Sequence, residues 1–282
     1  MFKKLAAGVA AAALCLTAIA TSVFADDKDG VDWGNGTIRA TGFAAGKSTT
    51  KIESIRRAQA RKAARMDAQR NLAEMVRGVR VTSESSVRDL ELEYDVVKTS
   101  VDATLRDMRE VSVKDFDDGT SEVILEMPLF GGDKSLAASA FLPYRDQEKQ
   151  PFPQPSTASE NNGTLVSGVT SEKYTGLIID CKGLNLSPVM SPVIKNDGGQ
   201  PIYGHQNLDI DKVIEFGMAS YTSNANDAIS HERAGENPLV VRAVKVEGFR
   251  ANPVVSVNDS DRILIANQND QFLDNMAVVF VK

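Results

Sequence analysis

The sequence predicts an α+β protein of two domains, in which the first domain packs a long and a shorter helix on a mixed or antiparallel sheet. Three observations support this fold class. A long uninterrupted helical pattern lies between strand-like segments in the first half of the chain, and a segment rich in proline and polar residues follows. The second half contains more strand-like runs, which predicts a separate, strand-rich C-terminal domain of α/β or α+β type.

The composition is that of an ordinary globular protein. The 282 residues include 32 Lys and Arg against 38 Asp and Glu, and 42% of the residues are hydrophobic. This balance argues against a disordered chain and against a strongly basic nucleic-acid-binding protein. Aromatic residues make up only 6% of the chain, which argues against stacking platforms for single-stranded nucleic acid. We therefore expect no nucleic-acid partner.

Residues 1–25 have the pattern of a signal peptide. Lys3 and Lys4 precede an apolar stretch from residue 5 to residue 19, and a small-residue processing site ends at Ala25. The alternative is a membrane anchor, but the run is rich in Ala and Gly and ends at that site. We expect cleavage after Ala25, export, and a periplasmic or outer-membrane-associated location.

The two cysteines have different expected fates. Cys15 follows Leu14, where lipoprotein processing prefers a small residue, so we expect no lipidation and assign Cys15 to the discarded apolar core. Cys181 is then the one cysteine of the mature chain, which excludes an intramolecular disulfide. It ends the strand-like run 175–181, so we expect a buried, unreactive thiol.

The first domain is expected over residues 36–145. Alternation predicts a strand at 37–43, and the segment 51–77, which lacks Pro and Gly, predicts a long helix that ends at Gly78. Small and apolar side chains recur every four residues along this helix, and we expect them to form a stripe that allows close approach to a sheet or to another helix, including one of a second copy. The stripe consists of Ala60, Ala64, Ala68, Leu72 and Val76, and the first four are the candidate interaction residues.

Three further elements complete the first domain. Alternating apolar residues predict a strand at 79–87, and apolar positions at helical spacing predict a shorter helix at 94–108. The segment 109–130 is expected to form a hairpin that turns at Asp117-Asp118-Gly119. Helices would then cover one face of the sheet.

A linker rich in Pro, Ser and Asn is expected at 146–165, followed by a strand-rich domain over 166–282. A turn is expected at 196–199. The expected strands lie at 176–181, 189–195, 239–246, 254–257 and 276–281. Short helices are expected at 209–219 and 259–267, the second capped by Asp259 or Ser260.

The long helix is basic and the segment after it is acidic. Residues 51–80 hold nine Lys and Arg against three acids, and residues 89–122 hold eleven acids against four bases. These charges can attract one another within a protomer or across a subunit contact, and contact with an anionic membrane surface is an alternative. Arg57, Arg61 and Arg65 therefore join the small-residue stripe as candidate interaction residues.

Few residues indicate catalysis. The segment 42–48 (GFAAGKS) lies where a phosphate loop would lie, but it has one residue too few between its glycines. His205 and His231 are the two histidines and lack the spacing of a zinc site, and no Gly-x-Ser-x-Gly elbow occurs. We therefore expect no enzyme, no cofactor and no metal centre.

A weaker candidate is a ligand site in the C-terminal domain that comprises Asp180, His205, Asp209 and Asp211. Asp209, Asp211 and Glu215 loosely resemble the spacing of a calcium loop, but the glycine and the alternating ligands of an EF-hand are missing. The simpler interpretation is that these acids favour a helix N-terminus and that His205 is a turn residue.

With these residues laid out, the first domain resembles the FlgP-like family of bacterial envelope proteins, which includes small outer-membrane lipoproteins and components of flagellar basal disks. The resemblance covers about residues 37–131 and rests on RAQARKAARMDAQRNLAEMVRG at 57–78 and VTSESSVRD at 81–89. The most specific part is DAQRNL at 67–72 followed by Gly78. Parts of the second half are similar to the extra domain of larger envelope proteins that carry this module, at 174–180, 186–192 and 202–204.

The resemblance implies a non-catalytic exported module that builds or attaches to envelope assemblies, without catalytic residues to transfer. The lipidation cysteine of the lipoprotein members has no proper counterpart here. We expect a structural or assembly role, associated with the outer membrane or a flagellum, through self-association or docking of the N-terminal module to envelope or flagellar proteins. The alternative is a periplasmic binding module for an envelope glycan, lipid or Ca²⁺ through the C-terminal domain.

Overall fold

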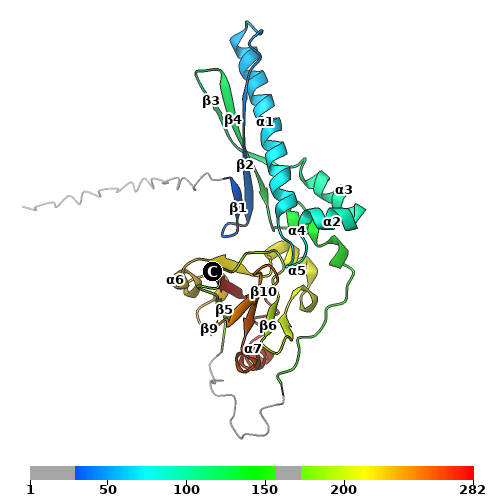
Figure 1. Cartoon of the computed structure of the whole chain (residues 1–282), viewed down its shortest axis with the longest axis vertical. Coiled ribbons are helices and arrows are strands. Elements are labelled where there is room, and N and C mark those ends of the chain that lie inside the picture. Colours follow the sequence, from blue (N-terminus) through cyan, green and yellow to red (C-terminus); the bar gives the residue numbers. More distant parts are fainter. Residues whose placement is uncertain (1–28, 157–172) are drawn as a thin grey trace, which may run out of the picture.

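The computed structural model describes residues 29–156 and 173–282, so the predicted signal peptide and Cys15 lie outside the described residues. The N-terminal part combines one long helix with an antiparallel sheet, and the C-terminal part is richer in strands (Figure 1). The mixed α+β class predicted from the sequence is confirmed.

The N-terminal sheet is antiparallel, with the strand order β1-β2-β4-β3. Its strands are β1 (Gly30–Asp32), β2 (Thr37–Ala45), β3 (Arg109–Asp115) and β4 (Thr120–Pro128). β3 and β4 form the predicted hairpin, and Gly119 has a positive φ of 83° in its turn. The outer strand β3 carries a bulge between Glu110 and Ser112, which makes its free edge a poor template for another strand.

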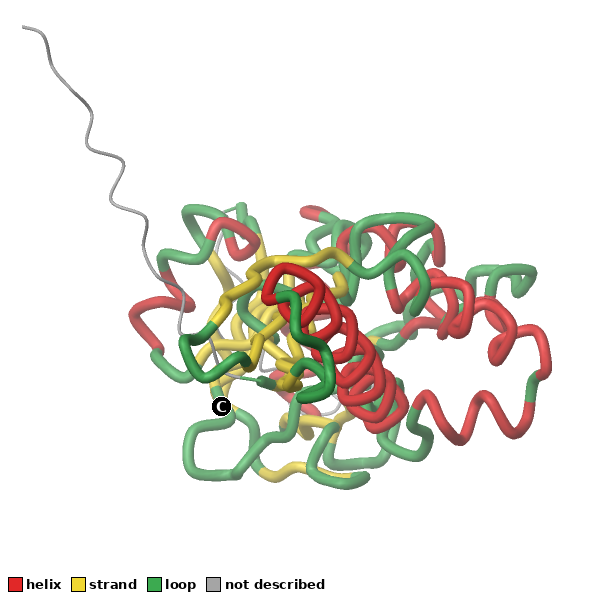
Figure 2. The backbone as a smooth tube through the Cα atoms, turned by 90° about the horizontal axis from the view of Figure 1, so that it is seen from above, coloured by secondary structure: helices red, strands yellow, loops and turns green. Residues whose placement is uncertain are grey.

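The long helix α1 (Glu53–Gly78) covers one face of this sheet, as expected, and Figure 2 shows it lying beside the strands. Its small side chains let it approach β2 very closely. Gly42 of β2 completes this fit, because a Cβ atom there would overlap the backbone of Ala64 and Ala68. The glycines of the segment 42–48 therefore serve packing, since a Cβ at Gly46 would likewise overlap Arg56.

Three shorter helices follow, α2 (Val87–Glu93), α3 (Asp95–Thr104) and α4 (Leu136–Ala140). The helix predicted at 94–108 is confirmed as α3, which ends at Thr104, whereas α2 is a helix that the sequence did not predict. Tyr94 separates the two helices with an extended backbone (φ −130°, ψ 108°). Ser86 and Asp89 form a capping box at the start of α2, which fixes the beginning of that helix.

The strand predicted at 79–87 is wrong. The segment folds into a tight loop in which the backbone N–H groups of Val81 and Thr82 both donate to the carbonyl of Ser85. The alternation that suggested a strand is nevertheless present in the burial, since Val79 and Val81 are buried. These side chains are buried at the boundary with the C-terminal domain. The alternation of apolar residues therefore comes from a contact between domains, and strand pairing does not cause it.

The C-terminal domain contains a parallel sheet with the order β8-β12-β5-β9. Its strands are β5 (Gly176–Asp180), β8 (Ser220–Thr222), β9 (Pro238–Arg242) and β12 (Val278–Val281). A second, mixed sheet has the order β10-β11-β6-β7. It is built from β6 (Ile194–Asn196), β7 (Pro201–Tyr203), β10 (Lys245–Glu247) and β11 (Asn252–Val255).

In the described residues 173–282, the α-helices are α5 (Ile210–Phe216), α6 (Ala225–Ile229) and α7 (Val257–Asp270). Ser256 caps α7, which corrects the predicted cap at Asp259 or Ser260. The predicted strand at 239–246 is two strands, β9 and β10, that belong to different sheets. The strand predicted at 189–195 begins only at Ile194, because the chain before it contacts the N-terminal domain.

The first part of the predicted linker is packed on the C-terminal domain, whereas residues 157–165 lie outside the described chain. Gln150 N–H donates to the carbonyl of Gln206 at 2.7 Å, and the ring of Phe152 stacks on Tyr203 with 6.5 Å between ring centroids. Ser156 donates both its backbone N–H and its hydroxyl to the buried carboxylate of Asp261. Residues 146–156 are therefore a fixed strap instead of a free spacer.

The close approach of α1 to β2 predicts that Gly42→Ala lowers the free energy of unfolding by about 3 kcal/mol, because the new methyl group meets backbone atoms that cannot move aside. Gly78→Ala is the matched control. Gly78 has open space around its Cβ position and an ordinary φ at the last residue of α1, so we expect equal or slightly higher stability. Urea unfolding of the two variants measures this difference, and equal stabilities would contradict the proposed fit.

Candidate functional site

The two domains meet through the loop that follows α1. The carbonyl oxygen of Arg80 accepts a hydrogen bond from the N–H of Met190 at 3.1 Å, and that of Val81 accepts one from the N–H of Ser191 at 2.7 Å. A third backbone bond runs from Gly131 to the carbonyl of Ile214 at 3.1 Å. We call residues 79–83 the junction loop, since it joins the domains by main-chain hydrogen bonds.

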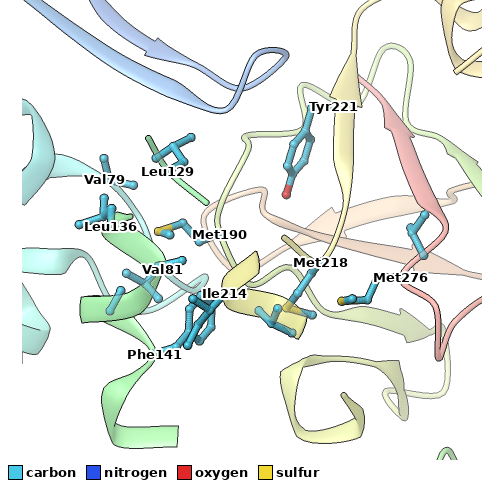
Figure 3. Packing of buried hydrophobic residues seen from close by; sticks show 14 of the residues in the cluster. Val79, Val81, Leu129, Leu136, Phe141, Met190, Ile214, Met218, Tyr221 and Met276 are labelled. Carbon is cyan, nitrogen blue, oxygen red and sulfur yellow. The ribbon is translucent and has the colours of Figure 1, made fainter. Parts of the chain in front are cut away.

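Buried apolar side chains continue across this boundary. Val79 and Val81 lie with Leu129, Leu136 and Phe141 of the N-terminal domain against side chains of the other domain (Figure 3). On the C-terminal side the figure shows Met190, Ile214 and Met218. All of these residues belong to one hydrophobic cluster, so the domains share a continuous core. Separating them would expose that core to water, which strongly favours a rigid pair.

A strained turn of the C-terminal domain also holds the junction loop. Gly248, Phe249 and Arg250 have consecutive positive φ values of 49°, 49° and 62°, a conformation that costs a residue with a side chain roughly 1–2 kcal/mol. The guanidinium of Arg80 lies over the Phe249 ring, 3.9 Å from its centroid. A Cβ at Gly248 would clash with Ser83, so the turn needs glycine there to reach the loop.

The predicted self-association stripe is occupied within the protomer. Ala60, Ala64, Ala68 and Leu72 are completely buried, and α1 packs on β2 and β4 of its own chain. A second copy would have to displace the sheet to reach these side chains. Of the two partners expected for the stripe, a sheet or another helix, the sheet of the same chain is the one observed, and the small size of these side chains serves this intramolecular fit.

The candidate arginines are exposed on α1, and all three are paired within the chain. Arg57 pairs with Glu53 at 2.5 Å, Arg65 pairs with Glu110 at 2.9 Å, and Arg61 binds Asp115 through two nitrogens. The hydrogen bonds from Arg61 and Ser121 hold the pKa of the Asp115 carboxyl at about 2. Of the two predicted alternatives, attraction within one protomer accounts for the charges of the basic helix and the acidic hairpin.

The weak ligand cluster is not gathered into one site. The carboxylate of Asp180 accepts from Lys182 N–H after β5, Asp209 caps α5, and Asp211 pairs with Arg145 at 2.9 Å. Within residues 29–156 and 173–282, no three His, Cys, Asp or Glu side chains lie together as a metal site requires. The simpler interpretation of Asp209 as a helix N-terminal residue is observed, and the predicted ligand grouping is corrected.

His205 instead lies where three segments meet. Its Nδ1 is 2.9 Å from the hydroxyl of Ser191, next to the junction loop, and its ring centroid is 4.7 Å from that of Tyr144. The neighbouring residue, Gln206, accepts the hydrogen bond from the strap at Gln150. Burial lowers the pKa of the His205 imidazole below its ordinary value of 6.5, so the neutral ring is favoured in the folded protein.

Cys181 is a buried free thiol, as predicted. Burial, with a smaller contribution from the charge of Asp180, raises its pKa to about 12, so the reactive thiolate is strongly disfavoured. In the described ranges no helix combines the length and apolar character needed to span a membrane.

Sequence reasoning missed the junction loop and its partners. The signal available was the buried, alternating pattern at 79–87 placed directly after a helix, which was interpreted as a strand. Nothing local marks Met190, Ile214 or Phe249 as its contacts, because each comes from a segment more than 100 residues further along the chain.

The C-terminal domain is similar to a known domain. A family model of the second domain of Tp0624 from Treponema pallidum matches residues 176–282. The match begins at the first residue of β5 and supports a distinct C-terminal domain of bacterial type. No curated protein matches the chain.

The lowered pKa of the half-buried His205 imidazole predicts a pH-dependent stability. As the pH is lowered from about 7.5 to about 5.5, the imidazole of the unfolded chain takes up a proton more readily than the imidazole of folded His205 does. The free energy of unfolding therefore decreases as the pH decreases. It levels off once His205 of the folded protein is protonated as well. His205→Gln should remove part of this dependence, measured by urea unfolding at both pH values. His231→Gln is the control that retains the His205 contribution, and an unchanged pH dependence in His205→Gln would contradict the assignment.

Proposed function

We propose that this chain is an exported, non-catalytic protein of a bacterial cell envelope that acts in assembly through its N-terminal domain. The C-terminal domain forms the base from which α1 and the β3–β4 hairpin project (Figure 1). The proposal includes a FlgP-like identity for the N-terminal domain and association with an outer-membrane or flagellar structure. The similarity of residues 176–282 to a Treponema domain supports the bacterial setting.

The distribution of exposed large apolar side chains carries this proposal. Among the described residues, nine of the fourteen such side chains belong to the N-terminal domain. They are Phe43, Ile52, Ile55, Met66, Leu92, Val96, Val111, Val113 and Phe116. Exposed apolar side chains are unfavourable in water, and where they gather on one part of a surface they mark sites that contact another molecule. We therefore place the assembly surface on the projecting helix and hairpin.

The outward side of α1 is the best-defined part of that surface. Ile55 is 46% exposed and Met66 is 62% exposed, and Met66 follows Ile55 by eleven positions, which is about three helical turns, so both point to the same side. The nearby arginines Arg61 and Arg65 are already paired with acids of the hairpin. A contact with a second copy through this side is therefore apolar in character and weakly dependent on salt.

Light scattering after gel filtration tests this proposal on the chain from residue 26 to residue 282. We expect a mass above that of one protomer, which rises with protein concentration and changes little with salt, because apolar contacts are not screened. Replacement of both exposed side chains, in Ile55→Glu/Met66→Glu, should return the mass to that of a monomer.

The matched control is Val240→Glu, at a 51% exposed position on the C-terminal edge strand β9. It adds one negative charge to an exposed apolar position outside the proposed surface, as each of the two α1 substitutions does within it, so the oligomer should persist. A monomer at every concentration, or the same dissociation in the control, would overturn the proposed assembly role of α1.

A further inference from the structure

A pocket of about 450 Å³ lies between the two domains, away from the junction loop. Residues of the β1–β2 hairpin and of the C-terminus line it. Figure 1 shows the hairpin close to the end of the chain. The side chains that bear on its chemistry are Asp29, Asp32, Trp33, Arg39, Ser223 and Lys282. Its volume is within the range of about 300–1,000 Å³ typical of small-molecule sites.

The floor of the pocket is the carboxyl edge of the parallel sheet. Thr222 is the last residue of β8, and Lys282 directly follows β12, with its N–H donated to the Thr222 carbonyl at 2.9 Å. In open α/β sheets, ligands bind at the carboxyl ends of the strands, where the chain leaves the sheet and side chains are free to face a ligand. The position of the pocket is therefore that of a binding site.

The charges of the pocket are balanced, with two carboxylates and two cations. Asp32 is held by hydrogen bonds from Gly34 and Asn35, and Arg39 pairs with Glu126 at 2.6 Å. A phosphate or a metal ion needs an excess of one charge, which this lining does not offer. A neutral ligand with hydroxyl groups fits better, because each hydroxyl both donates and accepts and can bond to groups that already have a partner.

The pocket also contains the one tryptophan of the chain. The Trp33 ring packs edge-to-face on Tyr221, with 5.7 Å between centroids and 70° between planes. Tyr221 is itself fixed, since its hydroxyl donates to the Val189 carbonyl at 2.9 Å. Trp33 is thus a rigid aromatic wall in a polar pocket, which is suited to the C–H face of a sugar ring.

We propose that this interdomain pocket binds a neutral saccharide of one or two rings. Trp33 contacts the apolar face of the sugar, and Asp29, Ser223 and Lys282 form hydrogen bonds with its hydroxyl groups. Both domains contribute to the site, so their rigid junction keeps the hairpin and the sheet edge at a fixed spacing. This binding role is separate from the assembly surface on α1.

Because Trp33 is the one tryptophan, its fluorescence reports occupancy directly. We expect a saturable change on titration with at least one of maltose, cellobiose and N,N′-diacetylchitobiose, and none with inorganic phosphate or Ca²⁺. Calorimetry should give about tenfold weaker binding for Trp33→Ala than for Trp33→Phe, because the second variant retains an aromatic wall. Ser223→Tyr, which fills the pocket, should abolish binding.

Ser230→Tyr, on the exposed end of α6, is the control for the added ring and should bind normally. Thermal unfolding of each variant separates loss of binding from loss of folding. No saturable change with any of the three saccharides, a response to phosphate or Ca²⁺ instead, or full binding by Ser223→Tyr would each overturn the proposal.

Discussion

The insertion of the junction loop into the C-terminal domain is the contact on which the rest of this structure depends. Main-chain hydrogen bonds from Met190 and Ser191 end on its carbonyl oxygens, and its valine side chains enter a core that both domains share. Backbone hydrogen bonds fix direction and register, whereas buried apolar area supplies most of the stability. The strained turn at 248–250 is kept in its unfavourable conformation by its contacts with the junction loop, which offset the cost of the positive φ angles.

A rigid junction gives the projecting helix and hairpin a defined position. The small-residue stripe of α1 is buried against its own sheet, and Arg61 and Arg65 are paired with acids of the β3–β4 hairpin. What remains exposed on this domain is a set of large apolar side chains and a blunted edge strand. The same junction holds the β1–β2 hairpin over the edge of the parallel sheet. The residues that line the pocket from the two domains therefore keep a fixed separation.

Sequence patterns predicted the elements whose structure depends mainly on neighbouring residues. The long segment without Pro and Gly predicted α1, and the Asp117-Asp118-Gly119 turn predicted the β3–β4 hairpin. The loop at 79–87 was mistaken for a strand because alternating burial is the same whether the partner is a sheet or another domain.

The pocket around Trp33 could not be predicted, since Lys282 and Ser223 reach it only through tertiary contacts that no spacing reveals. Asp180, His205 and Asp209 were grouped by residue type, and each of them has its own partner in the structure: Lys182 N–H for Asp180, the Ser191 hydroxyl for His205 and the start of α5 for Asp209.

Native-state hydrogen exchange tests the central claim most directly, since it measures the opening of individual amides. The amides of Met190 and Ser191 report the junction, and those of Val279 and Phe280 report the core strand β12. If the domains form one cooperative body, all four exchange only through global unfolding and with the same free energy. Fast exchange at Met190 and Ser191 while Val279 and Phe280 remain protected would show that the domains separate independently, and would contradict the account.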